Sequence, residues 1–216
     1  LASGKLLGAF SLSEPQSGSD ASNMRTFAKR DGDNYIINGT KNWVTNGISS
    51  DIVILMCMTV KNVGYKGITT FVVEKSFDGL STGKKEDKLG IRGSDTCELY
   101  FDDCKVPVEN RIGEEGEGFK IALGTLDGGR VGIATQALGI AAESLARSVE
   151  YAKERKQFGK AIGQFGAIQT KLAQMAIHVD AVRLLIHRAA KLKDEEKPFV
   201  KEAAMAKNFA SKVAMD

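Results

Sequence analysis

The first half of the chain alternates short apolar runs with polar turns. The runs cover residues 6–12, 26–30, 35–37, 52–60, 68–73, 80–89 and 96–101, and Asp31-Gly32-Asp33-Asn34 is a strong hairpin turn signal. Many short strands, with a turn about every 8–12 residues, are typical of an antiparallel barrel or sandwich. We therefore predict a β-domain over residues 1–110.

The hydrophobic period becomes helical from about residue 117. Apolar residues recur at i, i+3, i+4 and i+7 from Phe119 to Tyr151 and from Ala167 to Lys193, and a third helical stretch runs from Phe199 to Met215. Three long antiparallel helices leave one side of a bundle open. The pattern thus predicts an α+β chain in which residues 111–216 form an incomplete helical bundle.

Composition narrows the possible functions of this 216-residue chain. A net charge of +3 is too small to indicate nucleic acid or an anionic membrane as the partner. No apolar run approaches the roughly 20 residues that span a bilayer. Three cysteines without a CxxC pair indicate free thiols, and with only two histidines no metal site is predicted.

Residues 10–20 form the first segment with recognisable chemistry. They read F-S-L-S-E-P-Q-S-G-S-D, a strand-like run that ends at Pro15 and continues as a small polar loop. The Ser13 hydroxyl and nearby backbone N–H groups are suitable donors for the pyrimidine edge of a flavin, and Gly18 lets the backbone approach a ligand closely. Taken alone, the segment is also consistent with an ordinary surface turn.

The second segment, residues 38–46, contains the only tryptophan. Trp43 offers a flat face for a ring, and Thr45 lies two residues further on, so both side chains point to one face of a strand. From there the Thr45 hydroxyl can approach the flavin N5. Taken alone, these residues are also consistent with a core tryptophan beside an ordinary threonine.

The two segments together resemble those of acyl-CoA dehydrogenases, in the same order and spacing. Further matching segments are residues 83–94, 116–119, 126–130, 151–159 and 197–207. The resemblance covers essentially the whole chain and is greatest to the short-chain, butyryl-CoA type. It implies a middle β-domain followed by most of a C-terminal helical domain, without the family's N-terminal helical domain. It also implies a homotetramer, in a bacterial cytoplasm or a mitochondrial matrix.

The resemblance implies FAD as the cofactor and assigns residues to it. Those expected to contact FAD are Phe10, Leu12, Ser13, Gly18, Ser19, Trp43, Val44, Thr45, Arg155 and Phe158. Arg155 and Phe158 match residues that hold the pyrophosphate and adenine in a neighbouring subunit. The acyl-CoA contacts expected by the same comparison are Ser19, Asp127 and Arg130.

The implied reaction is α,β-dehydrogenation of a short-chain acyl-CoA to a trans-2-enoyl-CoA. A carboxylate removes the α-proton, the β-hydrogen leaves as hydride to the flavin N5, and the electrons pass to electron-transferring flavoprotein. In most of the family the base is a glutamate near the C-terminus, so it is expected beyond Asp216. The alternative family position for the base is Gly129 here, which cannot serve. We therefore expect no catalytic base within these residues and an inactive isolated chain.

Two alternatives remain open at this point. The same scaffold can support a flavin oxidase or monooxygenase, which the oxygen reactivity of the reduced protein would reveal. The chain can also act only as an FAD-binding or oligomerisation module, as the missing base suggests.

Overall fold

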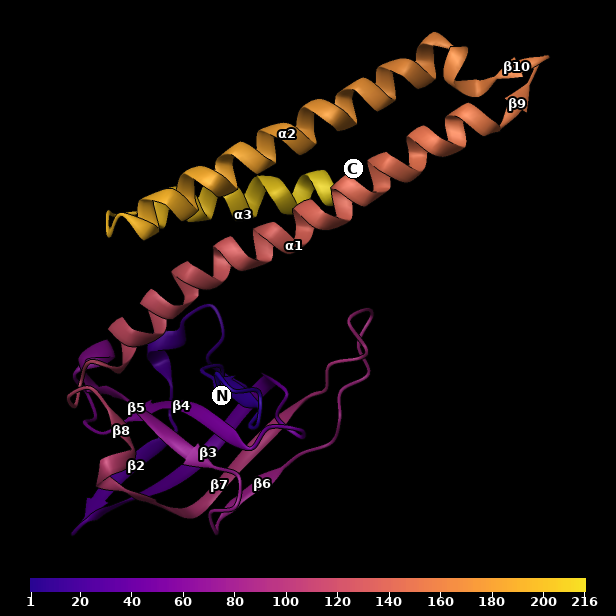
Figure 1. Ribbon diagram of the computed structural model, residues 1–216. Helices are drawn as coiled ribbons and strands as arrows, with labels where there is room; N and C mark the ends of the chain where they lie inside the picture. The colour runs from indigo at the N-terminus through magenta and orange to yellow at the C-terminus, as the bar shows by residue number, and fades with distance from the viewer. The chain divides into compact units, whose positions relative to one another are not determined.

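The computed structural model describes residues 1–216, which form two compact units, residues 1–123 and 124–216. The first unit is built on a β-sheet and the second on helices (Figure 1). This confirms the predicted α+β class. No helix combines the length and the apolar character needed to cross a membrane.

The first unit contains one eight-stranded sheet that is mostly antiparallel. Its strand order is β6-β7-β3-β2-β4-β5-β8, and β1 pairs with β4 in parallel. The sheet does not close into a barrel, because it ends at β6 and β8, which are only three and two residues long. The strands are β1 Gly8–Ser11, β2 Phe27–Asp31, β3 Asn34–Thr45, β4 Ile52–Met58, β5 Ile68–Glu74, β6 Leu80–Thr82, β7 Thr96–Pro107 and β8 Arg111–Ile112, with short 3-10 turns η1 Ala21–Asn23, η2 Gly64–Gly67 and η3 Val108–Asn110.

The largest differences from the predicted strands are at β3 and β7, which are much longer, and at β6, which is much shorter. β3 and β7 each run for 12 residues, because they pair along their whole length across two bulges. The predicted strand at residues 80–89 stops at Thr82, and the charged run that follows offers no apolar face to pack.

Apolar clusters lie on both faces of β4. Val53, Leu55 and Cys57 belong to one cluster, together with the edge-to-face pair Tyr35 and Phe71 at 4.8 Å between ring centroids. The alternate residues of β4 join a second cluster, which also includes Phe10, Leu12, Met24 and Phe119. Burial on both faces explains why β4 is almost continuously apolar in sequence.

The second unit is helical apart from one hairpin. α1 spans Gly118–Glu154 and so begins in the residues of the first unit; β9 Lys156–Gln157, β10 Lys160–Ala161, η4 Ile162–Gln164, α2 Gly166–Asp194 and α3 Val200–Met215 follow. Its core includes Ala134, Val182, Ile186, Ala206 and Ala210. Several large apolar side chains remain exposed, including Ile133, Ile140, Ile177 and Leu184.

Candidate functional site

A β-bulge determines which way Trp43 points. Between Lys41 and Val44, β3 has one residue more than its partner β7, where Leu99 and Cys97 oppose them. Without the bulge, simple alternation would turn Lys41, Trp43 and Thr45 to the same face. Instead Lys41 is fully buried, whereas Trp43 is 61% exposed and Thr45 is also exposed. Val44 between them is buried, so Trp43 and Thr45 share the outward face.

The backbone of Trp43 is left-handed, with a φ of 58°. Its N–H bonds to the Asn42 side-chain oxygen at 2.8 Å rather than to a neighbouring strand. A bulky residue in this region is a genuine outlier, and such strain is concentrated at functional sites.

The turn after Thr45 is held by Asp95 at the start of β7. The Ile48 N–H and the Ser49 hydroxyl donate to its carboxylate, and the Asn46 N–H donates to its backbone oxygen at 2.9 Å. Burial alone would raise the pKa of Asp95, but these hydrogen bonds outweigh it and lower the pKa. The end of β3 is therefore anchored on the side away from the bulge.

The loop after β1 is attached to β3 by its backbone. The Asn42 N–H donates to the Ser13 oxygen at 2.8 Å, and the Lys41 ammonium donates to the Leu12 oxygen at 2.9 Å. Leu12 and Ser13 are thus fixed beside the residue that precedes Trp43. In the same loop, Ser17 is buried and its hydroxyl bonds to the Asp20 oxygen, whereas Gly18 and Ser19 are exposed.

Glu14 and Lys41 form an ion pair that is almost completely buried. Lys41 Nζ lies 2.9 Å from Glu14 Oε1, and the side chains are 0% and 1% exposed. The carboxylate also accepts the backbone N–H groups of Arg25 at 2.6 Å and Thr26 at 3.0 Å. Burial alone would raise the pKa of Glu14, but the charge of Lys41 and these hydrogen bonds hold it below its ordinary value of 4.5.

This lowered pKa predicts a loss of stability in acid. A carboxylate with a depressed folded-state pKa stabilises the fold fully above its ordinary value of 4.5, and that contribution is lost as the pH falls through the lowered pKa. We expect Glu14→Gln to reduce the dependence of the free energy of unfolding on pH below about 4.5. Urea denaturation at a series of pH values measures this; Glu143→Gln, which changes an exposed carboxylate on α1, is the control and should keep the wild-type dependence.

Phe158 is a second exposed aromatic side chain with a left-handed backbone. It lies with Gly159 in the two-residue turn between β9 and β10, where Gln157 pairs with Lys160. Both turn residues have positive φ, 51° and 76°, a requirement of type I′ turns that favours Asn, Asp or Gly over Phe. The side chain is 92% exposed, and Arg155, just before the hairpin, is also exposed.

Asp127 and Arg130 lie one turn apart on α1. Arg130 Nη1 donates to Asp127 Oδ1, and the side chains are 38% and 15% exposed for arginine and aspartate respectively. Neither side chain is completely buried. Gly129 between them has no neighbouring atom within 4 Å of where a Cβ would stand, so the position is open.

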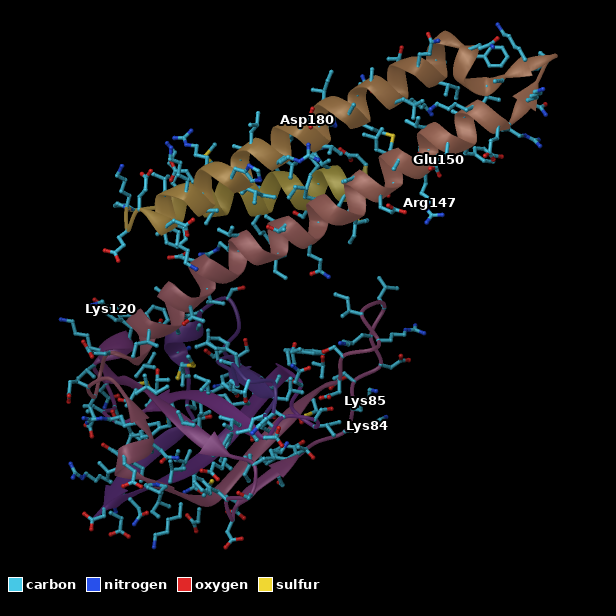
Figure 2. All side chains as sticks on the ribbon, viewed as in Figure 1. Lys84, Lys85, Lys120, Arg147, Glu150 and Asp180 are labelled. Atoms are coloured by element: carbon cyan, nitrogen blue, oxygen red, sulfur yellow. The ribbon has the colours of Figure 1, made fainter.

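Sequence reasoning missed the role of Lys41 and did not pair it with Glu14. A signal was present: Tyr35, Ile37 and Lys41 share the inward parity of β3, and a lysine at an inward position requires a buried acidic partner. By contrast, Lys84 and Lys85 lie exposed on the loop after β6 (Figure 2), as expected of a solvated charge run. Arg147 and Glu143 form an exposed pair on α1.

Comparison with family models assigns both halves of the chain. Residues 9–104 match the acyl-CoA dehydrogenase middle domain, and residues 116–216 match the acyl-CoA dehydrogenase C-terminal domain. The chain is 53% identical over 216 residues to a short-chain specific acyl-CoA dehydrogenase of Megasphaera elsdenii, covering 100% of this chain and 56% of that protein. It is 50% identical over 212 residues to the human mitochondrial short-chain specific enzyme, covering 98% and 52%.

Solved structures share the fold. The butyryl-CoA dehydrogenase of Megasphaera elsdenii superposes with a TM-score of 0.95 at 53% identity, over 97% of this chain and 55% of that one. A chain of a structure described as the electron transferring flavoprotein of Acidaminococcus fermentans gives a TM-score of 0.96 at 53% identity, over 99% and 56%. The chain therefore spans a little over half the length of the proteins it matches.

Proposed function

The chain belongs to the acyl-CoA dehydrogenase family, and we propose that it provides the flavin- and thioester-binding part of a short-chain acyl-CoA dehydrogenase. The proposed cofactor is FAD, the substrate a short-chain acyl-CoA, the product a trans-2-enoyl-CoA, and the electron acceptor electron-transferring flavoprotein. Two relatives named as short-chain specific enzymes, each about half identical to the whole chain, support the choice of substrate class.

The observation that carries this proposal is that two large aromatic side chains are exposed on a left-handed backbone. Trp43 and Phe158 are 61% and 92% exposed, and both have a left-handed backbone. A fold gains little by keeping large apolar rings in water on a strained backbone, so an external partner is the better explanation. FAD has an aromatic ring system at each end, so Trp43 fits its flavin end, and Phe158 fits the adenine end of the FAD of a neighbouring subunit.

The chain's own residues then have distinct tasks. Bound FAD supplies the hydride acceptor. Trp43 would cover one face of the ring and the Thr45 hydroxyl would approach N5, whereas Val44, whose side chain is buried in the core, could contribute only its backbone. Ser13 donates to the polar edge, and the Phe10–Ser19 segment lines the thioester. Arg155 would suit a bidentate pyrophosphate contact and Phe158 would stack on adenine, both toward the FAD of a neighbouring subunit. Ser19, Asp127 and Arg130 would contact the acyl-CoA.

We assign the catalytic base to no carboxylate of this chain. Glu14 is buried and bound to Lys41, and Asp127 is paired with Arg130. Gly129 has no side chain to ionise. The resemblance to the family implies a base beyond Asp216, so we propose that removal of the α-proton requires a group from outside these residues.

Anaerobic addition of butyryl-CoA to the FAD-loaded chain tests this reading. We expect the thioester to bind and to perturb the flavin absorption without bleaching it; bleaching by these 216 residues alone would contradict the absence of a base. After chemical reduction, slow reoxidation in air is expected of a dehydrogenase. Fast peroxide formation would instead indicate an oxidase.

Phe158→Asn separates cofactor binding from stability. Asparagine is favoured where φ is positive, so we expect the free energy of unfolding to stay equal or to rise by about 0.5–1 kcal/mol. Loss of adenine stacking should weaken FAD binding by roughly 5–100-fold. Denaturation and FAD titration measure the two effects, and an unchanged affinity would remove Phe158 from the site.

We also propose that the protein works as a homo-oligomer. The exposed apolar residues Ile133, Ile140, Ile177 and Leu184 of the helical unit support this, because isolated helices seldom leave so many in water. Both bacterial and mitochondrial relatives exist, and we propose a bacterial cytoplasm or a mitochondrial matrix as the compartment. Sedimentation analysis tests the oligomer.

A further inference from the structure

The buried ion pair of Glu14 and Lys41 links the two segments that form the proposed flavin site. Glu14 belongs to the loop after β1, and Lys41 belongs to β3, two residues before Trp43. The pair therefore joins the Leu12–Ser13 wall to the Trp43–Thr45 wall, although its two partners are 27 positions apart in sequence.

Every polar atom of the pair is used. Lys41 Nζ donates to Glu14 Oε1 and to the Leu12 oxygen, both at 2.9 Å, and lies 3.8 Å from Met24 Sδ. Glu14 Oε1 also accepts the Thr26 N–H, and Oε2 accepts the Arg25 N–H and the Gln16 side-chain amide at 2.6 Å each. Such saturation fixes the geometry of both side chains.

Stability alone does not explain a buried ion pair at this place. The cost of removing two charges from water often equals or exceeds their attraction, so apolar residues of similar size would stabilise the fold as well. What apolar residues cannot do is bind a specific carbonyl. Lys41 holds the Leu12 oxygen, and the adjacent Asn42 N–H holds the Ser13 oxygen at 2.8 Å.

Because of the bulge, the anchoring of Lys41 also affects the position of Trp43. Lys41 is the last inward residue before the bulge, and Trp43 lies on the strained, outward side of it. If Lys41 moves, its hydrogen bond to the Leu12 oxygen is lost, and the bulge that begins after Lys41 shifts as well. Neither Glu14 nor Lys41 is exposed enough to touch a ligand itself.

We propose that Glu14 and Lys41 are positioning residues, which set the spacing and orientation of the two flavin walls without contacting the cofactor. This inference rests on the proposed function, because it presumes that FAD binds between Ser13 and Trp43–Thr45. The pair is needed to hold the two walls in place, whereas apolar residues could provide the stability alone.

The test is a double variant, Glu14→Gln with Lys41→Met, which removes both charges and keeps the approximate size of each side chain. The readouts are FAD affinity and the visible circular dichroism of the bound flavin, which reports its asymmetric surroundings. We expect a folded protein with FAD affinity reduced about tenfold or more and an altered dichroism spectrum. The matched control, Glu143→Gln with Arg147→Met, removes an exposed ion pair on α1 and should change neither readout. Arg147 of this pair is labelled in Figure 2.

A folded double variant with wild-type FAD affinity and wild-type dichroism would overturn the inference. If the double variant does not fold, Glu14→Asp decides, since it keeps a carboxylate for Lys41 and for the Arg25 and Thr26 N–H groups but shortens the link between the two walls by one methylene. The wild-type flavin spectrum in that single variant would equally overturn the role of the ion pair. If the unaltered protein does not bind FAD, the proposed function itself is wrong.

Discussion

Replacing Gly39 with alanine should destabilise the protein by about 2–5 kcal/mol. Gly39 has a φ of 146°, which L-residues rarely adopt, and a Cβ there would stand 2.5 Å from the Thr26 hydroxyl oxygen and 2.6 Å from the Thr26 Cα. The contact with the Thr26 Cα cannot be relieved by rotating a side chain, because that atom belongs to the backbone. Strain and overlap therefore add.

The same substitution should also disturb the flavin site. Thr26 donates its N–H to Glu14, so displacement of Thr26 away from Gly39 acts directly on the buried ion pair. Chemical denaturation measures the stability, and FAD titration measures the site. Gly90→Ala is the control, because a Cβ at Gly90 meets no atom within 4 Å, and it should change stability by less than about 0.5 kcal/mol. Equal effects of the two substitutions would contradict the close approach of β3 to Thr26.

Trp43→Asn should lower FAD affinity by about 10–100-fold without destabilising the fold. The indole face is lost, and with it the stacking free energy of roughly 1–3 kcal/mol that an aromatic side chain gives to a planar ring. Asparagine, however, tolerates the positive φ of this position better than tryptophan does. The unfolding free energy is therefore expected to be unchanged or higher.

Trp43→Phe is the matched control for this prediction. It keeps an aromatic face and the backbone strain, so FAD affinity should fall by less than about fivefold. Isothermal titration and urea denaturation on the three proteins give both quantities. If Trp43→Asn instead lost stability and kept its FAD affinity, Trp43 would be a structural residue and the proposed wall would be wrong.

The helical half was predictable from the helical spacing of its apolar residues. The expected helices at residues 119–151, 167–193 and 199–215 lie within three residues of α1, α2 and α3 at each end. The strands were predictable as a class, but the parallel addition of β1 to β4 and the open sheet were not. Pairing direction depends on contacts between residues more than 40 positions apart, which leave no local pattern.

The site was predictable only in its surface residues. Two-residue spacing placed Trp43 and Thr45 on one face, and the structure agrees. Extended back along the strand, the same spacing would place Lys41 on that face as well, but the bulge reverses the parity there. A bulge inserts a residue without an apolar signature, so the face of Lys41 follows from its parity with Tyr35 and Ile37 but not from its parity with Trp43, and no periodic signal identifies Glu14 as its partner.

Protection of Trp43 by FAD tests the central claim most directly. Because the chain has a single tryptophan and its side chain is 61% exposed, acrylamide should quench its fluorescence readily in the absence of cofactor. If the flavin lies against Trp43, saturating FAD should reduce the acrylamide quenching constant severalfold. Binding of FAD with an unchanged quenching constant would contradict the account.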